Sequence, residues 1–214
     1  MSIDRIAQLK TMHLFGMAAA WNEWKAEYAT QKKPVMPEVW LDRLIAAEQA
    51  DRQAHRLNYQ LKAARFPIHR DLMKFDWHET PLQRGHIEQL ANGGFMDQAH
   101  NLILVGGTGT GKTHIATALG IAAIHQGKRL RFYNAVDLVN LLDKEKQQGK
   151  AGNLAKQLSH LDAVIIDELG YLPFPESGGA LLFHLISRLY EITSLVITTN
   201  LSFAEWVQVL VTPK

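Results

Sequence analysis

The sequence predicts an α/β fold, in which a parallel β-sheet covered by helices follows an α-helical N-terminal module. Three observations support this prediction. Short apolar runs alternate with helical patterns after residue 99, as expected of βαβ units. A glycine-rich turn joins the first apolar run to a helix. The region before about residue 90 shows long helical patterns and no convincing strand pattern.

Two long helices are expected in the N-terminal module. An apolar stripe predicts the first over residues 2–28. The second is expected over residues 37–64, because proline can open a helix and apolar residues then recur at helical spacing. Its C-terminal half carries four basic residues: Arg52, Arg56, Lys62 and Arg65. These residues fit either a solvated helix face or contacts with phosphates.

A connector leads from this module toward the sheet. The pair Phe66-Pro67 ends the second helix. Thr80 is expected to cap a further helix that begins at Pro81, continues to Leu90 and stops at an Asn-Gly-Gly signal. These boundaries divide the chain into a helical module over 1–65, a connector with a helix over 66–97, and an α/β core over 98–214.

The core is expected to contain four strands with helices between them. The strands are continuous apolar runs, which is typical of strands buried on both faces. They are predicted at 102–105, 130–133, 163–166 and 195–198, and the helices at 113–126, 136–147, 154–158 and 179–191. Ligands bind beyond the carboxyl ends of such strands. A sheet order of 1-4-3-2 would gather the polar residues that follow three of these strands.

The glycine-rich turn after the first strand matches the phosphate-binding pattern GxxxxGK[ST]. Its position between a strand and a helix argues against a chance glycine turn. Glycines let backbone N–H groups approach a polyphosphate, and the helix directs its positive end at the same charge. Lys112 is expected to neutralise the β- and γ-phosphates, and Thr113 to ligate Mg²⁺. The expected nucleotide-binding residues are Gly106, Gly107, Thr108, Gly109, Thr110, Gly111, Lys112, Thr113 and His114.

An acidic pair, Asp167 and Glu168, ends the third apolar run. Asp167 is expected to hold the magnesium ion. Glu168 can orient and deprotonate a water aimed at the γ-phosphate, a role worth about 10²–10⁴-fold in rate. A kinase that transfers phosphate to a bound acceptor has less need of such a base, so the pair favours a hydrolase. The alternative is a strand that ends in ordinary turn residues.

Asn200 follows the fourth apolar run. In the sheet order given above, it would lie between Lys112 and Glu168, where an amide can position the attacking water. Alone, Asn200 could equally be a turn residue. The combination of all three strand-end motifs favours the catalytic interpretation.

Composition excludes several other classes of protein. The 214 residues include no cysteine, so disulfides, thiol nucleophiles and cysteine-based zinc sites are excluded. No apolar run approaches the roughly 20 residues of a membrane helix, and the N-terminus lacks a signal-peptide pattern. A cytoplasmic protein without a membrane partner is therefore expected. The net charge of +2 neither requires nor excludes nucleic acid.

These motifs together resemble the AAA+ ATPases, and more narrowly the IstB-like helper ATPases of bacterial insertion sequences, which are related to the helicase loader DnaC. The resemblance covers nearly the whole chain and includes the segments 75–77, 109–114, 166–173 and 199–206. It implies ATP and Mg²⁺ as cofactors, oligomerisation on double-stranded DNA, and a transposase as partner. It also implies an N-terminal module that helps to hold DNA, which favours Arg52, Arg56, Lys62 and Arg65 as backbone contacts.

The sequence departs from this family pattern at its end. The family continues with a helix that carries an arginine for a neighbour's γ-phosphate, then a fifth strand and a nucleotide-sensing arginine. No arginine follows Arg188 here. An arginine supplied by a neighbour is worth roughly 10³–10⁵-fold in related NTPases, so a truncated chain is expected to bind ATP better than it hydrolyses it. Without the fifth strand, the first strand would be an exposed edge.

Two other functions stay open at this level. A DnaC-like helicase loader would share the fold and the nucleotide site but would bind a replicative helicase. A truncated module that binds nucleotide without hydrolysing it would only compete for subunit or DNA contacts.

Overall fold

The computed structural model describes residues 4–31, 36–78, 80–171, 174, 177–202 and 204–206. The chain divides into two compact units, one up to Tyr59 and one from Gln60 onward, and each is described by itself. Some residues of the segments that carry the family resemblance lie outside the described residues: Leu172, Pro173 and Phe203. The stretch 207–214 also lies outside them.

The first unit contains two helices where one was predicted over residues 2–28. Helix α1 spans Arg5–Thr11 and helix α2 spans Phe15–Gln31. The single-helix prediction is wrong because the chain turns between them, with His13 in the left-handed region at a φ of 58°. The apolar spacing continues through this turn, so periodicity alone does not reveal it. Asp4 caps α1 by accepting hydrogen bonds from the N–H groups of Ile6 and Ala7.

Helix α3 spans Pro37–Ala64, as predicted, and most of it belongs to the first unit. An aromatic cluster joins α2 to α3, with the ring centroids of Trp21 and Trp24 at 5.0 and 5.6 Å from that of Trp40. Gly16 is required at the crossing, because an added Cβ would lie 2.5 Å from the carbonyl oxygen of Ala47. The two helices therefore pack backbone against backbone at this point.

Short helical segments precede the sheet in the second unit. They are the 3₁₀ turn η1 at Leu72–Lys74, helix α4 at Arg84–Ala91 and helix α5 at Gly94–Asp97. The predicted helix start at Thr80-Pro81 is wrong. The Thr80 hydroxyl accepts a hydrogen bond from the N–H of Leu82 at 3.3 Å, which makes a local turn, and α4 begins only at Arg84.

Within the described residues, four parallel strands form one sheet in the order β1-β4-β3-β2, which confirms the predicted order. The strands are β1 (Leu102–Val105), β2 (Leu130–Asn134), β3 (Ala163–Leu169) and β4 (Ser194–Thr199). The helices between them are α6 (Lys112–His125), α7 (Ala135–Gln147), α8 (Asn153–Leu158) and α9 (Gly178–Leu189).

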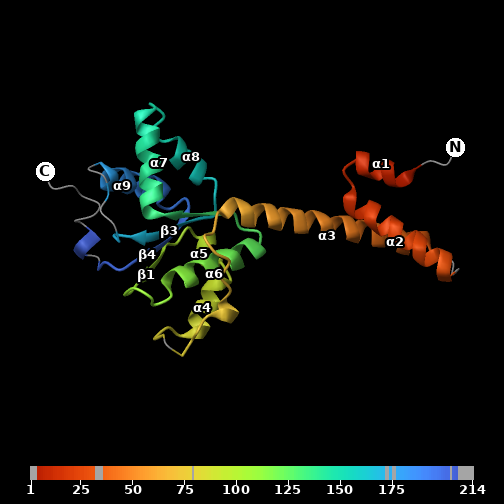
Figure 1. Ribbon diagram of the computed structural model, residues 1–214, viewed down its shortest axis with the longest axis horizontal. Helices are drawn as coiled ribbons and strands as arrows, with labels where there is room; N and C mark the ends of the chain where they lie inside the picture. The colour runs from red at the N-terminus through yellow and green to blue at the C-terminus, as the bar shows by residue number, and fades with distance from the viewer. Residues whose placement is uncertain are drawn as a thin grey trace. The chain divides into compact units, whose positions relative to one another are not determined.

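The helices cover both faces of the sheet, with α6 on one face and α7, α8 and α9 on the other (Figure 1). Side chains of β3 alternate accordingly. Val164 and Ile166 join the core beneath α7, α8 and α9, whereas Ile165 faces α6. Gly120 lets α6 approach β3 closely, because a Cβ there would lie 2.8 Å from Ile165. Because helices cover both faces of the sheet, side chains on both faces of the strands pack beneath helices, and the strands are continuous apolar runs.

Candidate nucleotide-binding site

The glycine-rich loop after β1 has the backbone conformation that its sequence predicts. Gly109 and Gly111 take positive φ angles of 79° and 84°, which residues with a Cβ rarely adopt. The loop is tied to the sheet because the N–H of Gly106 donates to the carbonyl of Thr199 at 3.2 Å. Helix α6 then begins at Lys112, so the free N–H groups of its first turn lie next to the loop. This arrangement is a binding site for a polyphosphate.

Lys112 is held inside this loop. Its Nζ donates to the carbonyl oxygen of Gly107 at 2.7 Å and lies 3.4 Å from the hydroxyl of Tyr171. The hydroxyl of Thr110 donates to the same carbonyl at 2.9 Å. The ammonium group is therefore already directed toward the loop, where phosphate oxygens can replace these neutral partners.

Asp167 lies opposite the loop and is buried, with 4% of its surface exposed. Its carboxylate accepts hydrogen bonds from the hydroxyl of Thr113, at 2.9 Å, and from the hydroxyl of Thr198. A carboxylate beside a threonine hydroxyl is the hard oxygen donor set that Mg²⁺ prefers. Thr113 and Asp167, both predicted as metal ligands, are thus brought together and fit the ion.

Glu168 occupies an unusual backbone position. The register of β3 with β4 shifts between Ile166 and Leu169, which marks a β-bulge, and the φ of Glu168 is 62°. Its N–H donates to the hydroxyl of Thr198 at 2.9 Å, which supports this conformation. Such strained positions cluster at functional sites. The bulge turns the exposed Glu168 side chain out of the alternation that buries its neighbours on the strand.

The side chain of Glu168 is bound by Asn134, which the sequence analysis missed. Asn134 ends β2, and its Nδ2 donates to the carboxylate of Glu168 at 2.7 Å. Parallel pairing of β2 with β3 places Asn134 directly opposite Asp167. A polar residue at the end of the second predicted strand was the available signal, but only the strand pairing gives it a partner.

A pocket of about 360 Å³ lies between the loop and the acidic pair. It is lined by Arg70, Thr108, Gly109, Gly111, Lys112, Thr113, His114, Glu168, Tyr171 and Thr198. Arg70, Tyr171 and Thr198 were not predicted. Asn200 is exposed directly after β4 and does not line the pocket, which at this strand is lined by Thr198. Its role in positioning water stays a prediction.

His114 and the segment before the core close one side of the site. The Nε2 of His114 donates to the carbonyl of Asp71 at 2.9 Å, and its ring lies edge-on to that of Phe75, with centroids 5.1 Å apart. A Cβ on Gly111 would lie 2.6 Å from the ring of Phe75. The glycine is therefore needed both for its φ angle and for this close contact.

The four basic residues predicted to contact DNA all lie on or beside α3 and are exposed. Arg52 also donates from Nε to the buried carboxylate of Glu48 at 2.7 Å. Arg56 belongs to the first compact unit, and Lys62 and Arg65 belong to the second. Arg65 follows the helix in the left-handed region, at a φ of 59°.

A parallel sheet in the order 1-4-3-2, with a phosphate loop after β1 and an acidic pair near the carboxyl end of β3, defines a P-loop NTPase core. The profile of the family described as "IstB-like ATP binding protein" matches residues 7–214, and the chain belongs to this family.

Named relatives come from insertion sequences. The ATP-binding protein of insertion sequence IS5376 from Geobacillus stearothermophilus is 34% identical over 200 residues, which cover 93% of this chain and 79% of the relative. The ATP-binding protein of insertion sequence IS21 from Pseudomonas aeruginosa is 35% identical over 176 residues, which cover 82% of this chain and 66% of the relative. The chain therefore matches part of the length of each.

Solved structures show the same fold. The DnaC helicase loader matches with a TM-score of 0.55 and 23% identity, over 65% of this chain and 86% of that one. The replication initiator DnaA, solved with AMPPCP and single-stranded DNA, matches with a TM-score of 0.57 and 19% identity, over 70% of this chain and 46% of that one. At these identities the likeness establishes the fold alone.

The described parts of the chain contain neither a candidate membrane-spanning helix nor a metal-binding cluster of side chains. No helix there combines the length and apolarity needed to cross a bilayer. No group of three or more histidine or carboxylate side chains is arranged there to hold a metal ion.

Proposed function

We propose that this protein is an ATP-dependent helper ATPase for transposition, which oligomerises on double-stranded DNA and recruits or activates a transposase. The observation that carries the nucleotide part is the hydrogen bond from Thr113, which lines the pocket together with Lys112 and Glu168, to the buried Asp167. This contact joins the phosphate loop to the acidic end of β3, as a site for a nucleoside triphosphate with Mg²⁺ requires.

Each residue of the site has its own role in this proposal. Lys112 and the loop N–H groups bind the phosphates, and Thr113 and Asp167 would hold Mg²⁺, which neutralises phosphate charge. Glu168 accepts a proton from the attacking water. Asn134 holds the Glu168 carboxylate in place by its hydrogen bond and so fixes the direction from which that base acts. Asn200, which directly follows β4 and does not line the pocket, stays a prediction for directing the water.

The transposition role is supported by the family and by relatives that are 34% and 35% identical. Likeness to the DnaC helicase loader supports the fold but not a shared partner. The basic residues Arg52, Arg56, Lys62 and Arg65 are the proposed phosphate contacts on duplex DNA.

The proposal is tested by two variants and a matched control. Lys112→Ala removes the charged phosphate contact and is expected to weaken ATP affinity by about 10–100-fold, measured with a fluorescent ATP analogue. Glu168→Gln is expected to retain affinity while turnover falls by about 10²–10⁴-fold. Lys156→Ala, an exposed lysine on α8, removes the same charge elsewhere and is expected to change neither quantity.

Turnover is measured with and without duplex DNA, and partners are isolated by affinity purification from cells that also express a candidate transposase. Unchanged affinity in Lys112→Ala would refute the nucleotide site. Unchanged turnover in Glu168→Gln would refute the assignment of the base. Recovery of a replicative helicase in place of a transposase would assign the chain to helicase loading.

A further inference from the structure

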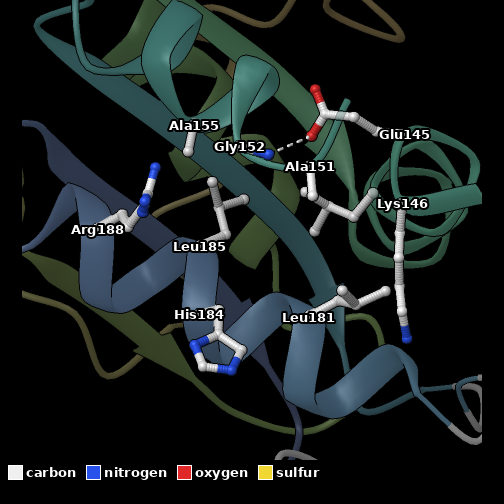
Figure 2. A pocket seen from close by; sticks show the side chains of 10 residues that line it. Glu145, Lys146, Ala151, Gly152, Ala155, Leu181, His184, Leu185 and Arg188 are labelled. Atoms are coloured by element: carbon white, nitrogen blue, oxygen red, sulfur yellow. Dashed lines mark hydrogen bonds between the residues drawn. The ribbon is translucent and has the colours of Figure 1, made fainter. Parts of the chain in front are cut away.

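A second pocket, of about 270 Å³, lies between α7, α8 and α9, on the helices that cover one face of the sheet (Figure 2). We call it the α7–α9 groove. Its α9 wall is formed by residues at the spacing of a single helix face: Leu181, His184, Leu185 and Arg188. The opposite wall comes from α7, from the turn before α8 and from α8 itself: Leu142, Glu145, Lys146, Ala151, Gly152 and Ala155.

The rim of the α7–α9 groove carries two basic residues and one acidic residue, so it is basic on balance. Glu145 is its one acidic residue, and its carboxylate is already bound by the N–H groups of Gly152 and Leu154, at 3.1 and 2.7 Å. Lys146 and Arg188 are exposed and form no ion pair with any described residue. The Arg188 guanidinium lies over the groove, since a Cβ on Gly152 would be 3.1 Å from its Nη1.

The size and lining of the groove limit what it can hold. Leu142, Leu181 and Leu185 give it an apolar floor. Pockets for drug-sized molecules measure about 300–1,000 Å³, so a volume of about 270 Å³ suits one or two apolar side chains better than a free cofactor. The matching occupant therefore presents short apolar side chains flanked by carboxylates.

The same chain displays such a surface at the start of α3. Glu38, Leu41, Asp42 and Ile45 recur at the spacing of one helix face, and all four are exposed. We call this set the α3 acidic surface. Leu41 and Ile45 are 50% and 38% exposed, although both are apolar. Neither Glu38 nor Asp42 forms an ion pair with a described residue.

We propose that the α7–α9 groove of one copy receives the α3 acidic surface of a second copy. Leu41 and Ile45 fill the apolar floor, while Glu38 and Asp42 approach Lys146 and Arg188 at the rim. The two surfaces differ, so the contact is heterologous, and each copy keeps a free groove and a free acidic surface for the next one. The contact uses no residue of the nucleotide site and forms without nucleotide.

The test is a charge exchange in the full chain, followed by sedimentation equilibrium without nucleotide. The wild-type mass is expected to rise with protein concentration. Arg188→Glu and Asp42→Arg each place like charges together, so each is expected to weaken self-association at least tenfold. The double variant Arg188→Glu/Asp42→Arg restores opposite charges with exchanged positions and is expected to recover most of the association.

Two matched controls change the same charges at residues that belong to neither surface. Lys156→Glu on α8 and Glu23→Arg on α2 are expected to associate as the wild type does. A wild-type chain that stays monomeric, a double variant without recovery, or equal losses in the controls would each overturn the proposal. So would an Arg188→Glu variant that loses binding to duplex DNA but associates normally. Circular dichroism melting of every variant separates loss of contact from loss of fold.

Discussion

Glu48 is a buried carboxylate inside the first compact unit, with 6% of its surface exposed. Its hydrogen bond from Arg52 lowers its pKa below the ordinary value, and burial opposes this shift without reversing it. The N–H of Met17 donates to the same carboxylate at 3.2 Å. Glu48 therefore links the start of α2 to the middle of α3 through its charged form.

A group whose pKa is lowered on folding stabilises the protein above its unfolded pKa, which is about 4.3 for glutamate, and this stability is lost as pH falls through the folded value. Glu48→Gln is expected to lower stability by about 1–3 kcal/mol at pH 7, because the hydrogen bonds lose their charge. The difference from the wild type is expected to shrink below pH 4. Thermal melts across pH measure it, with exposed Glu23→Gln as the control. A difference that does not depend on pH would contradict this account.

At the nucleotide site, the sequence predicted the residues whose roles follow from a local pattern. The phosphate loop and the acidic pair are contiguous motifs, so Lys112, Thr113 and Asp167 could be found without a fold. Asn134 and Thr198 act through strand pairing, and Tyr171 through a loop that folds back onto Lys112. Such contacts depend on register, which single-sequence patterns do not specify.

At the scale of elements, the α2–α3 crossing depends on the absence of a side chain at Gly16. Gly16→Ala would place a methyl group 2.5 Å from the carbonyl of Ala47, where only backbone could move to relieve the contact. We expect a loss of about 1–3 kcal/mol, as in other overpacked sites. Tryptophan fluorescence reports mainly on this unit, because Trp21, Trp24 and Trp40, three of the five tryptophans, lie in it.

Gly85→Ala supplies the matched comparison. Gly85 lies in α4, and a Cβ there would meet no atom within 4 Å. Alanine is a better helix former than glycine by about 0.5–1 kcal/mol, so this variant is expected to be neutral or more stable. Equal destabilisation by both substitutions would contradict this account of Gly16, because an alanine that meets no other atom in a helix is not expected to lower stability.

Periodicity predicted elements well where burial decides the structure, and poorly where local turns do. The four strands and the helices between them follow from apolar patterns, because burial in the sheet or against its faces sets the spacing of their apolar residues. The break at His13 and the late start of α4 depend instead on backbone turns at polar residues. Those turns satisfy hydrogen bonds locally and leave the apolar spacing unchanged.

At the scale of the whole molecule, the sheet order predicts which strands open most easily by local unfolding. Within the described residues, β3 and β4 are paired on both sides, whereas β1 and β2 are each paired on one. Amide hydrogen exchange measured by mass spectrometry is expected to be slowest in 164–166 and 196–198 and faster in 102–105. Exchange in β1 as slow as that in β3 would indicate that a further element covers the β1 edge.

The place of β4 between the other strands joins both halves of the nucleotide site to the chain that follows. Thr198 contacts Asp167 and Glu168, and the next residue, Thr199, accepts the hydrogen bond of Gly106 in the phosphate loop. A triphosphate that draws the loop toward the carboxylates must therefore displace this strand or strain it.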